Sequence, residues 1–126
     1  MSPDRDLVRL SHMLEAARDA RDMAARTNLE ELRINRMLQP ALVKSIEIIG
    51  EAARQVSAPA RARIPEIAWS EIIGMGHRLI HTYYEIDARL VWNTVTEDLP
   101  ALIAQLEPRV PAGLPRLRDS FDMSPE

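Results

Sequence analysis

The chain has 126 residues, enough for one domain, and its apolar fraction of 46% with only five aromatic residues predicts an aliphatic, helix-rich core. A net charge of −3 excludes a uniformly basic surface, so contact with nucleic acid would need a local basic pocket or one assembled between subunits. The absence of cysteine excludes disulfides, thiolate metal sites and cysteine nucleophiles, and it is typical of a reducing compartment.

A first helix is predicted near the N-terminus. Ser2 followed by Pro3 is typical of an N-cap with proline at the first helical position. Leu7, Leu10 and later apolar residues recur with helical spacing as far as about Arg26. The spacing therefore predicts one helix that buries its apolar side.

Further helix starts follow in the next part of the chain. Thr27 and Glu30 have the spacing of a capping box, and Asn35 can cap another start. Pro40 is expected in a first helical turn or at a kink. Residues 41–57 are apolar over a broad face, which predicts burial on two sides, as in a bundle or a dimer.

In the middle of the chain, residues 58–65 are expected to form a connection. The apolar spacing after them predicts a helix over residues 69–80, which leads into a polar segment. Gly74 and Gly76 lie inside this predicted helix. Each glycine should destabilise a helix by roughly 1 kcal/mol relative to alanine. Close packing of backbone or ligand would explain why the chain has glycine at these positions.

The last helix is predicted to begin after a turn over residues 85–87, with Asp87 as its N-cap, and Pro100 should kink or divide it. Residues 1–107 therefore predict an all-α, up-and-down bundle of four to five helices. Residues 108–126 are rich in proline and predict a loosely ordered tail. No apolar run reaches the roughly 18 residues of a membrane span, so we expect a soluble, cytoplasmic protein.

The densest polar chemistry lies in residues 76–84, Gly-His-Arg-Leu-Ile-His-Thr-Tyr-Tyr. In a helix, His77 and His81 would stand one turn apart with Arg78 beside His81. A proton-transfer group, a fixed cation and a phenol are what phosphodiester chemistry needs without a metal. The two histidines and Glu85 also have the spacing of zinc ligands. The cation of Arg78 would repel a metal, however, so no metal and no cofactor is predicted.

Structural roles compete with catalytic ones for each of these residues. His81 would satisfy carbonyls at a helix end, and His77 would serve in packing or hydrogen bonding. Arg78 would form a surface or interhelical ion pair, and Tyr83 would lie at a helix end as an amphipathic residue. Glu51 would either order a site or form a plain salt bridge.

Three stretches together resemble the HepT-like (DUF86) family of the HEPN superfamily. They are IEIIGEAA at residues 46–53, IAWSEIIGM at residues 67–75 and HRLIHTYYEID at residues 77–87, followed by Val91-Trp92 and Asp98-Leu99-Pro100. The likeness covers roughly residues 4–107. It implies an all-helical homodimer that acts as the toxin of a type VII toxin–antitoxin pair. Such toxins are metal-independent endoribonucleases, and a minimal nucleotidyltransferase antitoxin (MntA-like) neutralises them by transferring AMP to a tyrosine.

The family motif consists of an arginine, four residues, a histidine, one residue and the modified tyrosine. By resemblance, the histidine falls on His81 and the AMP acceptor on Tyr83. The arginine should stand at position 76, where this chain has Gly76 instead. The next position is often Asn or His in the family and is His77 here, followed by a basic residue, Arg78, as in many relatives.

The departure at Gly76 leaves two functions open. The first is an RNA endonuclease with His81, Arg78 and His77 as its catalytic residues, supported by Glu51 and Tyr84. The second is a non-catalytic helical dimer that binds nucleotide or RNA, or that serves as the substrate-binding partner of the nucleotidyltransferase. A purely structural dimer is less consistent with the polar cluster.

Overall fold

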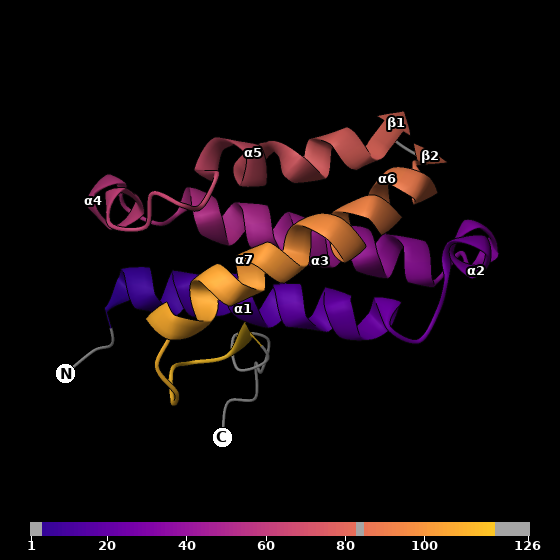
Figure 1. The fold of residues 1–126 in the computed structure, drawn as a ribbon. Coiled ribbons are helices and arrows are strands. Elements are labelled where there is room, and N and C mark those ends of the chain that lie inside the picture. Colours follow the sequence, from indigo (N-terminus) through magenta and orange to yellow (C-terminus); the bar gives the residue numbers. More distant parts are fainter. Residues whose placement is uncertain (1–3, 83–84, 118–126) are drawn as a thin grey trace, which may run out of the picture.

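The computed structural model describes residues 4–82 and 85–117, apart from the side chains of residues 81 and 82. Successive helical arms run in alternating directions, as Figure 1 shows. The arms are α1 (Arg5–Ala24), α3 (Leu38–Arg54), α5 (Trp69–Gly74) continued by the 3₁₀ helix η1 (Met75–Leu79), and α6 (Ala88–Asn93) continued through the π-helical turn η2 (Thr94–Asp98) into α7 (Leu99–Leu106). The prediction of an all-α, up-and-down bundle is confirmed.

Short elements connect the arms at the two ends of the bundle. These are α2 (Leu29–Ile34), α4 (Ala58–Ala62) and the strands β1 (Ile80–Thr82) and β2 (Glu85–Ile86), and the 3₁₀ turn η3 (Glu107–Arg109) follows the last arm. In Figure 1, α2 joins α1 to α3 at the end where β1 and β2 lie, and α4 joins α3 to α5 at the opposite end. Within the described ranges, no helix combines the length and apolar character needed to cross a membrane.

Two helices begin later than the sequence predicts. The Asp4 carboxylate, not Ser2, caps α1 by accepting backbone hydrogen bonds from its first turn. The Asn28 side chain accepts a hydrogen bond from the Glu31 backbone N–H at 2.9 Å, so the cap lies one residue after Thr27. Both predicted positions are wrong because Ser, Thr, Asn and Asp cap with similar strength, and neighbouring candidates compete.

Other predicted signals are confirmed. Pro40 lies in the first turn of α3. The Asn35 side chain accepts a hydrogen bond from the Leu38 backbone N–H at 2.9 Å, although the residue directly before α3 is Met37, which makes no side-chain cap. The Asp87 carboxylate caps α6 by accepting from the Leu90 backbone N–H at 3.0 Å. These caps satisfy amide groups that have no partner inside their own helices.

Pro100 perturbs the last helical arm, as the sequence predicts. Proline has no N–H to donate, and its ring clashes with the carbonyl four residues earlier. The backbone widens into η2, where the Leu99 N–H donates to the Thr94 carbonyl five residues back. The arm therefore continues from α6 into α7 with one turn of altered spacing.

The predicted helix over residues 69–80 holds only in part. The α-helical geometry ends at Gly74, and the chain tightens into η1, whose Met75 and Leu79 are buried in the core. From Ile80 the backbone is extended and pairs antiparallel with β2, with Ile80 opposite Ile86. The helical prediction is wrong here because glycine weakens the helix and the β-branched and aromatic residues that follow favour a strand.

The core lies where α1 and α3 pack against each other and against the last arm. Small side chains make up much of the buried side of α1, which lets the two helices approach closely. The largest fully buried side chains are Met13, Leu32, Leu42, Ile46, Ile49, Leu79, Leu99, Leu106, Val91 and Val95. They are aliphatic, as the composition predicts.

Residues 107–117 fold back along α1. Glu107 pairs with Arg18 at 2.8 Å, and the Leu117 backbone N–H donates to the Glu15 carboxylate at 2.9 Å. His12 on α1 is buried near this segment, and its burial lowers the pKa of the imidazole. The tail beyond residue 117 lies outside the described residues, so the boundary at residue 107 stays a prediction.

Asp6 connects the start of α1 to the start of α4. Its carboxylate accepts hydrogen bonds from the Ser57 backbone N–H at 2.8 Å and from the Ser57 hydroxyl at 2.7 Å. These bonds hold the pKa of Asp6 below its usual value. A carboxyl group with a lowered folded-state pKa stabilises the fold above its unfolded pKa, and that stabilisation is lost as the pH falls.

We therefore predict that Asp6→Asn lowers the free energy of unfolding at neutral pH by about 1 kcal/mol. The variant should also lose less stability than the wild type when the pH is lowered through about 4, where this carboxyl is protonated in the unfolded chain. Urea unfolding at both pH values measures this. Asp4→Asn is the matched control because it removes the same charge and keeps a good cap. Equal behaviour of the two variants would contradict the role of the Ser57 contact.

Candidate functional site

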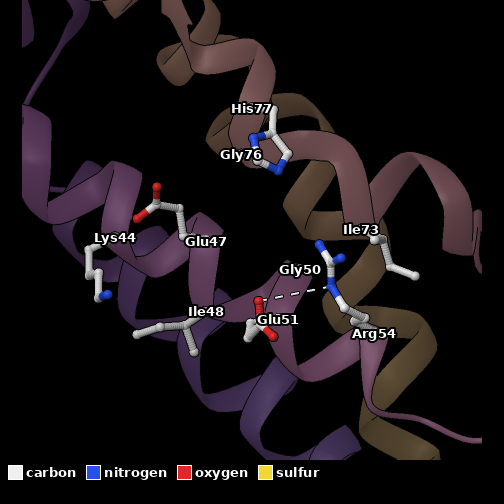
Figure 2. A pocket seen from close by; sticks show the side chains of 9 residues that line it. All are labelled: Lys44, Glu47, Ile48, Gly50, Glu51, Arg54, Ile73, Gly76 and His77. Carbon is white, nitrogen blue, oxygen red and sulfur yellow. Dashed lines mark ion pairs between the residues drawn. The ribbon is translucent and has the colours of Figure 1, made fainter. Parts of the chain in front are cut away.

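A cleft of about 310 Å³ lies between α3 and the α5–η1 arm, and we call it the α3–η1 cleft. It is lined by Lys44, Glu47, Ile48, Gly50, Glu51, Arg54, Ile73, Gly76 and His77. Figure 2 shows the His77 imidazole on the η1 side and the Glu51 and Arg54 side chains on the α3 side. Part of the polar segment singled out by the sequence therefore faces charged residues of another helix.

Glycine lets the two walls of this cleft approach each other. A Cβ atom at Gly50 would lie 3.1 Å from the carbonyl oxygens of both Ile72 and Ile73. A Cβ atom at Gly76 would lie 3.1 Å from Cγ of Glu47, which is tighter than an ordinary van der Waals contact. Close packing therefore explains Gly76, but it does not explain Gly74, whose Cβ would meet nothing within 4 Å.

His77 and Arg78 are neighbours in the chain but line different clefts. Arg78 lines a second cleft of about 260 Å³ between α5 and α7, the α5–α7 cleft, together with Glu97 and Asp98. There its guanidinium donates to the Glu71 carbonyl at 3.2 Å. Successive residues of a 3₁₀ helix point about 120° apart, so η1 separates these two side chains. The sequence-based site places them together, and the structure does not.

His81 lies in β1, and its side chain is outside the described part of the structure, as are Tyr83 and Tyr84. On either side of this segment, the Asp87 N–H donates to the Leu79 carbonyl at 2.7 Å. His81 thus follows η1 directly. The helical one-turn relation between the two histidines is wrong, because the chain between them changes from a 3₁₀ helix to a strand.

The zinc alternative loses its geometric basis for the same reason, since its His-x₃-His spacing requires a helix. Among the side chains that the structure describes, no group of three or more His, Asp and Glu residues is arranged to hold a metal ion.

Glu51 lines the α3–η1 cleft and pairs with Arg54, with 3.9 Å between the Arg54 Nε and the Glu51 carboxylate oxygen. Both side chains are largely exposed, 54% for Arg54 and 65% for Glu51. A long, exposed ion pair contributes little stability. The pair therefore holds the Arg54 guanidinium only weakly and involves its Nε alone.

The other charged residues of this cleft, Lys44, Glu47 and Arg54, are not among the predicted site residues. Glu47, Glu51 and Arg54 are spaced four and three residues apart, which places them along one face of α3. That spacing was a usable signal. It pointed to a polar stripe on a helix whose remaining faces are apolar.

Comparisons with a family model and with individual proteins point to the same protein family. The family model described as "Ribonuclease HepT-like" matches residues 13–108. "Probable ribonuclease HepT" of Thermococcus cleftensis is 37% identical over 78 residues, which cover 62% of this chain and 71% of the relative. "Putative RNase MJ1380" of Methanocaldococcus jannaschii is 35% identical over 98 residues, which cover 78% of this chain and 90% of the relative. No solved structure gives a significant match.

We predict that Gly50→Ala destabilises the protein by about 1–3 kcal/mol, because the added methyl group meets backbone oxygens that cannot rotate away. Gly74→Ala is the matched control in the same arm. It should leave stability unchanged or raise it by up to about 1 kcal/mol, since alanine favours helix and the space is open. Chemical denaturation of both variants measures the difference, and equal stabilities would show that α3 and α5 are not held at this distance.

Proposed function

Because the chain belongs to the ribonuclease HepT-like family, we propose that it is a metal-independent endoribonuclease whose site includes the α3–η1 cleft and the adjoining strand β1. The family match over residues 13–108 carries this proposal. The relatives named above are themselves named as ribonucleases. The cleft supports it, because it holds an imidazole and a guanidinium on facing elements.

In the proposed reaction, the 2′-hydroxyl of the RNA attacks the adjacent phosphorus. The new bond joins O2′ to phosphorus, and the bond from phosphorus to O5′ breaks. A base removes the proton of the 2′-hydroxyl, and an acid supplies a proton to the departing O5′. The products are a cyclic phosphate and a 5′-hydroxyl, so no metal, water or cofactor enters this step.

His81 is the proposed proton-transfer residue, since an imidazole can serve as either a general acid or a general base near neutral pH. One histidine cannot hold both proton-transfer roles at once. A homodimer with His81 from each copy near a twofold axis would supply both groups, and His77 is the proposed second group within one chain. An arginine offsets the charge that grows on the phosphorane oxygens, and the sequence offers Arg78 for this role. Glu51 and Tyr84 are proposed as supporting residues.

We further propose that this ribonuclease is the toxin of a type VII toxin–antitoxin pair in the cytoplasm. Its neutralisation would be the transfer of AMP from ATP to the Tyr83 hydroxyl by a minimal nucleotidyltransferase, with release of pyrophosphate. The family assignment supports this proposal, as does a tyrosine two residues after His81.

One observation favours a second function. Gly76 occupies the position of the motif arginine, and a side chain there would press against Glu47. A chain without that arginine would bind RNA or nucleotide, or present Tyr83 to the nucleotidyltransferase, without cutting RNA. Binding without cleavage separates this function from the first.

The purified protein should cleave single-stranded RNA in the presence of EDTA and leave cyclic phosphate ends. His81→Ala should slow cleavage by at least about 100-fold, as loss of a general acid or base does. Arg36→Gln, an exposed substitution before α3, is prepared in parallel and should cleave like the wild type. Intact RNA at high wild-type concentration, or equal rates for wild type and His81→Ala, would reject the proposed ribonuclease.

Incubation with ATP and a nucleotidyltransferase encoded beside this gene should add the mass of one AMP to the chain. Tyr83→Phe should abolish the addition because it removes the acceptor oxygen, whereas Tyr84→Phe should retain it. Intact-mass spectrometry measures both. An unchanged wild-type mass with a nucleotidyltransferase that is active on ATP would reject the proposed modification.

A further inference from the structure

The α3–η1 cleft raises the question of which cation faces a phosphate bound beside His77. Position 76 has no side chain, and the space next to it is occupied by Glu47. An unneutralised phosphorane is costly in a cleft of this kind, so an efficient site needs a positive group aimed at it. The candidates are the basic side chains that line the two clefts.

Two of these candidates do not face His77. The Arg78 guanidinium lies in the α5–α7 cleft, where it donates to the Glu71 carbonyl and has Glu97 and Asp98 along the same wall. Lys44 lines the α3–η1 cleft, but Figure 2 shows its amino group directed away from His77.

Arg54 has the required position. It comes from the last turn of α3, and Figure 2 shows its guanidinium directed toward the part of the cleft that Gly76 and His77 line. Its side chain contacts Glu51 through Nε at 3.9 Å. Among the described residues, its two terminal amino groups make no hydrogen bond, so both can bind a phosphate through two parallel hydrogen bonds, which is the strong geometry for this pair.

The backbone below Arg54 is held in place by a second arginine. The Arg61 guanidinium donates to the carbonyl of Arg54 at 2.9 Å and to the carbonyl of Val56 at 3.0 Å. It also lies over the Trp69 ring, 5.9 Å from the ring centre. These contacts fix the last turn of α3 before a ligand arrives, so little order has to be created on binding.

We propose that Arg54 replaces the arginine missing at position 76 and binds the scissile phosphate of the RNA beside His77. Gly76 and His77 line the same cleft as Arg54, so a phosphate bound there can lie beside both the imidazole and the guanidinium. The weak contact with Glu51 gives way to the more strongly bound phosphate. This inference rests on the proposed ribonuclease function for the reaction, but the phosphate contact itself can be measured without cleavage.

The experiment compares Arg54→Gln, Arg54→Lys and Arg78→Gln with the wild type, with Arg36→Gln as the control. Cleavage of a short single-stranded RNA in EDTA gives the rate, and binding of single-stranded DNA of the same sequence gives the affinity without chemistry. Arg54→Gln should slow cleavage by about 100-fold, as loss of one charge-stabilising group does, and should weaken binding. Arg54→Lys should retain part of both, because it keeps the charge but not the two-pronged geometry.

A rescue variant tests the replacement directly. Gly76→Arg added to Arg54→Gln should restore much of the lost rate, and Gly76→Ala added to Arg54→Gln controls for the packing effect of a Cβ atom at this position. Rescue by arginine and not by alanine supports the proposal. Thermal unfolding of each variant shows whether the fold is retained, and Arg54 is exposed enough for the glutamine variant to fold.

The outcomes separate this inference from the proposed function. If the wild type binds DNA through Arg54 but leaves RNA intact, the proposed ribonuclease function is overturned and the role of Arg54 as a phosphate ligand is retained. Wild type that cleaves RNA, with Arg54→Gln equal to it in both rate and binding, overturns the role of Arg54. A wild type that neither cleaves nor binds overturns both. Loss of binding in Arg78→Gln alone places the phosphate in the α5–α7 cleft and also overturns the inference.

Discussion

The close contact between α3 and the end of α5 determines where the candidate site is formed. Gly50 brings α3 against the carbonyl oxygens of Ile72 and Ile73, and no larger residue fits there without displacing backbone. η1 begins directly after this contact, so it carries His77 over the charged face of α3. The cleft is thus produced by backbone packing. The charged side chains are placed in it by the helical spacing of α3.

Much of the fold could be predicted from the sequence because its signals are local. Apolar spacing gives the helical arms, Asp87 caps α6, Asn35 accepts a hydrogen bond from the first residue of α3, and Pro100 follows a turn of altered geometry. The wrong caps, at Ser2 and Thr27, have equally good competitors nearby. The change from helix to strand at Ile80 was less accessible, because Met75 and Leu79 keep a helical apolar spacing up to that point.

The site was predicted less completely than the fold. The sequence identified His77 and Glu51, which do line one cleft, but it grouped Arg78 with them. Adjacent residues point about 100–120° apart in either type of helix, so His77 and Arg78 face different sides of η1, and only the placement of α3 and α7 shows that these sides belong to different clefts. Arg54 was detectable from its spacing to Glu51. Its relevance became visible only when α3 and η1 were placed together.

The most direct measurement is a crystal structure of the protein bound to a single-stranded oligonucleotide that it cannot cleave, such as DNA. We predict a phosphate in the α3–η1 cleft, with its oxygens accepting hydrogen bonds from the Arg54 guanidinium and with the His77 imidazole beside it. A phosphate held by Arg78 between α5 and α7, with no nucleotide in the α3–η1 cleft, would contradict the account.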